Sequence, residues 1–204
     1  MTERGVDQRS NTPRRTEWTK SRHAAGAKAR VVSERVFGYE YGRIDGGFRP
    51  RPDWCFQADS AIAAVATTTQ TLHGAWMERL TVQPPGGAPV RPKVVVGPIA
   101  SGNKVVDDLT DETFAPVLRM WPKLLAVEME AWGAVEAIQD AHERNRPTGF
   151  SMIRGISDRP VRRSGTHRPA KERKAWKAYA AEVAAAYVRF LIETDWPYEA
   201  RGAG

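Results

Sequence analysis

The run KVVVGPIASG at 93–102 constrains the fold more than any other part of the sequence. Its apolar residues follow one another without polar alternation, and the run ends in the small residues Ser101 and Gly102. Continuous runs of this kind are typical of strands in parallel sheets that are covered on both faces. The sequence therefore predicts a buried strand that breaks into a loop at its carboxyl end.

Strands and helices are expected to alternate along the rest of the chain. Further strands are predicted where β-branched, aromatic or apolar residues gather, at 31–42, 125–129 and 150–156. Apolar residues at helical spacing predict helices at 59–77, 130–143 and 171–193. Proline and glycine predict loops at 46–54 and 83–89. This order favours an α/β domain with a largely parallel sheet.

The positive charge of the chain is concentrated at its start. The net charge is +7, and residues 1–30 hold eight Lys or Arg against three acids, with Trp18 as the only large apolar side chain. Such a segment cannot build a core, so we expect a basic, solvated leader at 1–30, a domain at 31–198 and a tail at 199–204. Basic tails can contact nucleic acid, but this one lacks interleaved aromatics, and we do not expect it to.

Cysteine content and hydropathy narrow the class of protein. Cys55 is the only cysteine, which excludes an internal disulfide and a cysteine-ligated zinc cluster. The sequence has no apolar run near the roughly 20 residues that a membrane helix needs. The four histidines show no metal spacing, so we expect neither a metal nor an organic cofactor. These features favour a cytoplasmic protein that binds no membrane.

Three carboxylates stand out at the ends of predicted strands. Glu128 and Glu130 lie one residue apart where the strand at 125–129 turns into a helix, and Asp158 follows the next strand in the company of Arg154 and Ser157. Open α/β sheets place ligands at the carboxyl ends of their strands. Asp158 is equally well explained as a turn or N-cap residue before a proline. One of the glutamates is equally well explained as a partner of the helix dipole.

Carboxylates in this arrangement suit the cleavage of a bond between a sugar and a nucleobase. One carboxylate can bind the ribose hydroxyls and face the positive charge that grows on the sugar. A separate acid can protonate the departing base, which contributes a rate factor of roughly 10²–10⁴. The residues alone thus favour a nucleoside as substrate, with Asp158 as a candidate for the acid.

The motifs FGYEYG, GPIASGNKVV, AVEMEA and IRGISD occur in an order and spacing that resemble the nucleoside phosphorylase and nucleosidase superfamily. The chain is most similar to its 5′-methylthioadenosine/S-adenosylhomocysteine nucleosidase branch, from about residue 31 to residue 191. The resemblance implies a three-layer α/β fold, an N-ribosyl hydrolase activity and a homodimer. AVEMEA and the ISD of IRGISD are its most specific parts.

The resemblance also implies roles for individual residues. Glu130 would bind the ribose 2′- and 3′-hydroxyls, with Met129 packed against the sugar and Glu128 beside them. Asp158 would donate a proton to purine N7, positioned by Ser157. The adenine would lie against Val105 and Val106. The remaining implied pair, Phe37 and Tyr39, would form an exposed aromatic subsite that covers the 5′-substituent across the dimer interface.

Two departures from the family pattern qualify these expectations. Val105 stands where the family commonly has a phenylalanine that stacks on the base. Val31 corresponds to the middle of the family sheet, so the first strands, with the acid that orients water, have no counterpart in residues 1–30. We therefore expect a sheet with an exposed edge beside Val31, and a chain that is inactive or barely active alone. Phosphorolysis and a non-catalytic nucleoside-binding domain are the alternatives to hydrolysis.

Overall fold

The computed structural model describes residues 29–198 apart from 73, 88–89, 146–147, 162–167 and 195. The expected leader, except its last two residues, and the expected tail lie outside the described residues. The first element begins at Ala29, two residues before the expected start of the domain. Among the described residues, no helix is long and apolar enough to cross a membrane.

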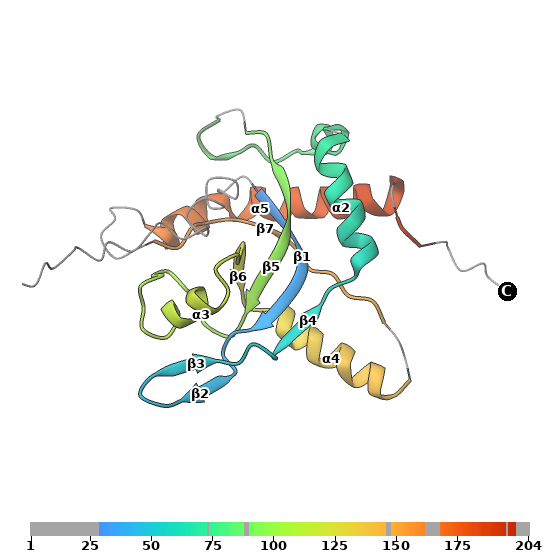
Figure 1. The fold of residues 1–204 in the computed structure, drawn as a ribbon. Helices are drawn as coiled ribbons and strands as arrows, with labels where there is room; N and C mark the ends of the chain where they lie inside the picture. The colour runs from blue at the N-terminus through green and yellow to red at the C-terminus, as the bar shows by residue number, and fades with distance from the viewer. Residues whose placement is uncertain are drawn as a thin grey trace, which may run out of the picture.

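Strands and helices alternate through most of the described chain (Figure 1). The strands are β1 (Ala29–Gly38), β2 (Gly42–Ile44), β3 (Phe48–Pro50), β4 (Cys55–Gln57), β5 (Lys93–Ser101), β6 (Ala126–Glu128) and β7 (Ile153–Gly155). The helices are α2 (Ser60–Leu72), α3 (Ala115–Met120), α4 (Ala131–Glu143) and α5 (Pro169–Thr194), with short 3₁₀ helices η1 (Ala75–Arg79) and η2 (Pro85–Gly87).

The central sheet is built on the long parallel pair β1 and β5. The two strands pair in parallel over nearly their whole length, and β6 extends the sheet in parallel beyond β5. The other edge of β1 carries two short antiparallel strands, β7 along its first half and β4 along its second half. A separate antiparallel hairpin is formed by β2 and β3. The expected α/β class with a mostly parallel central sheet is confirmed.

Helices cover both faces of the sheet. On one face, α2, η1 and α5 pack over Val32 and Val94. A register shift between Ser33 and Val36 reverses the side-chain parity of β1, so that Val36 pairs with Ile99 and faces the opposite side from Val94. There Val36 packs against α4. The sheet is therefore the middle layer, as the continuous apolar run of β5 predicted.

Several elements differ from the sequence prediction. The strand expected at 31–42 ends at Gly38, where the backbone turns and the N–H of Tyr41 donates to the oxygen of Gly38. Position 38 also requires glycine, because a Cβ there would lie 2.8 Å from the ring of Trp132. The expected loop at 46–54 contains β3, and β4 and α3 were not predicted. The edge expected to be exposed beside Val31 is occupied by β7, so this expectation was wrong for β1.

Candidate active site

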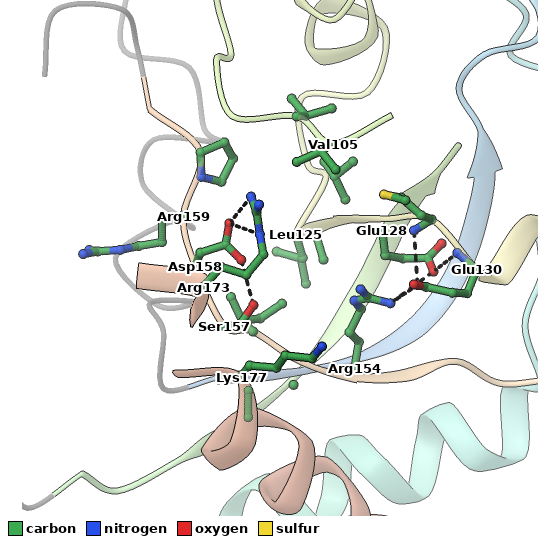
Figure 2. Close-up of a pocket in the computed structure, with 18 of the residues that line it drawn as sticks. Val105, Leu125, Glu128, Glu130, Arg154, Ser157, Asp158, Arg159, Arg173 and Lys177 are labelled. Atoms are coloured by element: carbon green, nitrogen blue, oxygen red, sulfur yellow. Dashed lines mark hydrogen bonds and ion pairs between the residues drawn. The ribbon is translucent and has the colours of Figure 1, made fainter. Parts of the chain in front are cut away.

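A cavity of about 520 Å³ opens between β6, β7 and the first turns of α5. This volume lies within the range of pockets that hold small-molecule ligands. Eight of the ten site residues expected from the sequence line it: Val105, Val106, Glu128, Met129, Glu130, Arg154, Ser157 and Asp158. In Figure 2 the glutamates with Arg154 lie on one side of the cavity and Asp158 with Ser157 on the other.

The turn from β6 into α4 is built around Glu128. Its side chain is fully buried, and Oε2 accepts hydrogen bonds from the backbone N–H groups of Glu130 and Ala131, at 2.8 and 2.9 Å. The hydroxyl of Ser101 accepts the next N–H, that of Trp132, at 2.9 Å. These bonds satisfy donors at the start of α4 that a helix leaves unpaired. Glu128 therefore supports the turn through Oε2, while its buried Oε1 has no hydrogen-bond partner among the described residues.

Glu130, in contrast, presents its carboxylate to solvent. Its side chain is 63% exposed and forms an ion pair with Arg154, which also lies 3.4 Å from the buried Oε2 of Glu128. Partial burial alone would raise the pKa of Glu130, but the hydrogen bond and charge of Arg154 outweigh it, and the pKa lies below its usual value. Glu130 is thus ionised near neutral pH and held in place at the rim of the cavity.

Asp158 lies at the far end of the cavity and is held from two sides. The hydroxyl of Ser157 donates to its Oδ1 at 2.7 Å, and Nε and Nη2 of Arg173 donate to its Oδ2 at 3.2 and 2.9 Å. Arg173 also donates to Asp107. The bonds to Asp158, and then those to Asp107, raise the pKa of Arg173 above its ordinary value. Both oxygens of the Asp158 carboxylate are therefore engaged in the unliganded protein.

The position of Asp158 in the sheet differs from the prediction. β7 runs antiparallel to β1, so Asp158 does not share an edge with the carboxyl ends of β1, β5 and β6. The segment that follows β7 nevertheless reaches the cavity that Glu130 lines. The apolar cluster of Val31, Ile99 and Ala126 packs against Leu125, Met152 and Ile156, which line that cavity. An apolar floor thus separates the two charged ends.

Close packing of α5 on β7 brings Arg173 to the site. A Cβ at Gly155 would lie 2.0 Å from the backbone oxygen of Ala180, so only glycine permits this approach. The first turns of α5 then place Arg173 and Lys177 on the cavity wall. Sequence analysis missed both residues. The sequence shows that they lie one helical turn apart. It also shows other basic residues close by on the same helix, and nothing in the pattern distinguishes those that face a cavity from those that face solvent.

Phe37 and Tyr39 do not form the expected exposed subsite. Both rings are buried in the chain's own core and neither lines the cavity. Phe37 stacks on Trp121 with ring centroids 4.6 Å apart, and Tyr39 makes an edge contact with Phe114. The expectation of an exposed aromatic patch was wrong, because the two ends of α3 supply ring partners, Phe114 before the helix and Trp121 after it, that the sequence pattern did not reveal. Neither ring argues for a dimer, which stays a prediction.

Tyr39 instead supports one wall of the cavity. Burial, with the nearby charge of Glu40, raises the pKa of Tyr39 to about 12, so its hydroxyl remains protonated. That hydroxyl donates to the backbone oxygen of Lys104 at 3.2 Å, and Lys104 forms an ion pair with Glu40. Val105 follows directly and is 58% exposed on the cavity wall. The contact thereby fixes the apolar segment against which a base was expected to lie.

No group of three or more His, Cys, Asp or Glu residues is placed to hold a metal ion in the part of the chain that the structure describes. The acids at the cavity have arginine partners instead: Glu130 pairs with Arg154, and Asp158 pairs with Arg173. The arrangement suits proton transfer and the binding of hydroxyl groups. Its donor set is not that of a cation site.

Neither a protein-family model nor a curated protein sequence matches the chain. Solved structures do match it. A protein of Borrelia burgdorferi bound to adenine, assigned to the 5′-methylthioadenosine/S-adenosylhomocysteine nucleosidases, superposes with a TM-score of 0.55 at 19% identity, over 91% of this chain and 64% of its own.

Two further nucleosidases of this kind give similar values. The enzyme of Neisseria meningitidis, in complex with methylthio-immucillin-A, has a TM-score of 0.54 at 21% identity, over 82% of this chain and 62% of its own. That of Colwellia psychrerythraea, in complex with adenine, has a TM-score of 0.54 at 22% identity, over 83% and 61%. The chain spans less than two thirds of the length of each, and it shares their fold.

Proposed function

We propose that the chain is a purine-nucleoside N-ribosyl hydrolase. One observation carries the proposal: a single cavity holds an exposed, ionised Glu130 at one end and the Ser157–Asp158 pair at the other, with an apolar wall between them. A nucleoside has the same layout, with hydroxyls on the sugar and ring nitrogens on the base. The shared fold with nucleosidases that bind adenine or a nucleoside-like inhibitor supports the assignment.

In this mechanism Glu130 binds the ribose and Asp158 acts on the base. Arg154 keeps Glu130 ionised, so its carboxylate accepts hydrogen bonds from the ribose hydroxyls and faces the positive charge of the oxocarbenium-like transition state. Met129, which is 43% exposed beside Glu130, packs against the sugar.

Departure of the base requires a proton at the other end of the cavity. The C1′–N9 bond breaks with its electron pair moving to the base, and Asp158 transfers a proton to N7. Because Arg173 donates hydrogen bonds to Oδ2 of Asp158, purine binding must displace that contact before the transfer. Water then adds to C1′, and the proton that it releases restores Asp158 through solvent. The reaction consumes one water and yields ribose and the free base.

The test is release of free base from purine nucleosides by the purified 204-residue chain, with and without inorganic phosphate, at protein concentrations high enough to detect the low activity expected of the chain alone. Hydrolysis predicts release that does not depend on phosphate and that Glu130→Gln lowers by at least tenfold. Glu143→Gln removes an exposed charge from the far end of α4 and serves as the matched control, with unchanged release.

The other outcomes assign the alternatives. Release that requires phosphate would replace hydrolysis by phosphorolysis. Nucleoside binding without any release would indicate a non-catalytic binding domain. Release that is equally fast in the parent chain and in Glu130→Gln would refute the role of this carboxylate.

A further inference from the structure

The geometry points to a preference of this cavity for 6-oxopurine nucleosides over 6-aminopurine nucleosides, with Arg173 and Lys177 as the residues that select the base. The inference rests on the proposed function and deepens it. It concerns the base end of the cavity, where Asp158 and Arg173 form the wall, and the stretch beside it that Lys177 of the same helix lines.

Hydrogen-bond donors dominate this end of the cavity. Arg173 and Lys177 lie one helical turn apart on α5 and both line the cavity. Arg173 uses Nε and Nη2 to bind Asp158 and Asp107, which leaves Nη1 without a bond to any described residue. The ammonium group of Lys177 makes no hydrogen bond or ion pair with the described part of the chain. Both side chains therefore offer donors to a ligand.

The carboxylate oxygens of Asp158 at the same end are already engaged. Oδ1 of Asp158 accepts from Ser157, and Oδ2 accepts from Arg173. A ligand group that donates hydrogen bonds would have to displace one of these contacts and would face two cations. A ligand group that accepts hydrogen bonds meets free donors directly.

The substituent at position 6 of a purine lies next to N7 on the same edge of the ring. When Asp158 contacts N7, this substituent lies beside Asp158. Arg173, which is hydrogen-bonded to Asp158, forms the cavity wall there. The N7 and O6 atoms of a 6-oxopurine are both acceptors and are matched by Arg or Lys. The N7 and amino group of adenine form an acceptor–donor pair that is matched by Asn or Gln instead. The cationic wall thus selects an oxygen at position 6.

The test compares binding of hypoxanthine and adenine to the complete chain by isothermal titration calorimetry, together with base release from inosine and adenosine. Discrimination by one well-placed donor set is worth about 1–3 kcal/mol, so we expect hypoxanthine to bind on the order of tenfold tighter or more. The chain should likewise release base faster from inosine than from adenosine.

Two variants and one control locate the selectivity. Lys177→Met should reduce the ratio of the two affinities severalfold by weakening hypoxanthine binding. Arg173→Gln should shift the ratio toward adenine, since glutamine matches the adenine edge. Lys174→Met removes the same charge from an exposed residue of α5 that does not line the cavity, and it should leave the ratio unchanged.

The outcomes separate this inference from the proposed function. Adenine binding as tightly as hypoxanthine, with adenosine cleaved at least as fast as inosine, would overturn the selectivity while the hydrolase proposal stands. An unchanged ratio in both Lys177→Met and Arg173→Gln would overturn the assignment to these residues. Failure of the chain to bind either base or cleave either nucleoside would overturn the proposed function, and the inference with it.

Discussion

Replacement of Glu128 by alanine should destabilise the fold far more than the same change at Glu130. Glu128 is buried and makes two charge-assisted hydrogen bonds to the N–H groups of Glu130 and Ala131. Bonds to charged groups contribute about 1.5–3 kcal/mol each, so their loss costs roughly 3–6 kcal/mol. The same change also removes the buried Oε1, which has no partner among the described residues, and this raises the free energy of unfolding by about 1–3 kcal/mol. With the low and the high values taken together, the net loss is about 2–3 kcal/mol.

Glu130 is expected to behave as a surface residue in the same experiment. Its side chain is 63% exposed, and exposed ion pairs contribute roughly 0–1 kcal/mol, so Glu130→Ala should lower the free energy of unfolding by no more than about 1 kcal/mol. Glu128→Gln keeps an acceptor for the two N–H groups and should fall between the two alanine variants.

Urea unfolding followed by circular dichroism measures all three variants against the parent chain. A loss of about 2–3 kcal/mol corresponds to a fall in Tm of roughly 4–12 °C for a domain of this size. Equal losses from Glu128→Ala and Glu130→Ala would refute the division of the two carboxylates into a buried support and an exposed ligand. A Glu128→Ala variant as stable as the parent would refute it as well.

Three further predictions concern other positions. Asp158→Asn should fold normally but lose a factor of roughly 10²–10⁴ in kcat for base release, since an amide cannot donate the proton; an unaltered kcat would exclude Asp158 as the acid. Gly155→Ala should cost about 1–3 kcal/mol or more in urea unfolding, because the added Cβ meets Ala180; an unchanged midpoint would contradict the close approach of α5. Arg30→Met should not lower stability near neutral pH, since Arg30 is buried without a hydrogen-bond partner among the described residues and burial lowers its pKa to about 9. Any gain in the free energy of unfolding of this variant should shrink as the pH rises above about 9, because the arginine of the folded parent chain then loses its proton while that of the unfolded chain retains it. A loss of stability at pH 7 would instead assign Arg30 a stabilising contact, such as the one with Trp76.

The sequence predicted the framework because hydrophobic pattern and local composition decide it. The unbroken apolar run of β5 indicated a sheet covered on both faces, and helices cover both faces of the sheet. The acids at 128 and 130 were correctly placed at a strand-to-helix turn. Their different burial was not predictable, since it depends on Ser101 and Arg154 arriving from distant strands.

The parts that sequence analysis missed all depend on tertiary contacts. Phe37 and Tyr39 are buried because α3 and the segment before β6 pack on them, and the pattern of that short helix is too weak to predict. Arg173 reaches Asp158 because Gly155 lets α5 approach β7. Periodicity shows that α5 has a charged face, but not which of its charged residues turn toward a cavity.

The central claim is that this cavity stabilises positive charge on a ribose while a base departs. The most direct test is the ratio of dissociation constants for an immucillin, whose cationic iminoribitol mimics the oxocarbenium-like sugar, and for the matching neutral nucleoside. Transition-state analogues bind enzymes about 10²–10⁸-fold more tightly than substrates do. We expect the parent chain to bind the immucillin at least about 100-fold more tightly, and Glu130→Gln to lose most of this preference. Equal affinity of the parent chain for the two ligands, or a preference that Glu130→Gln leaves intact, would contradict it.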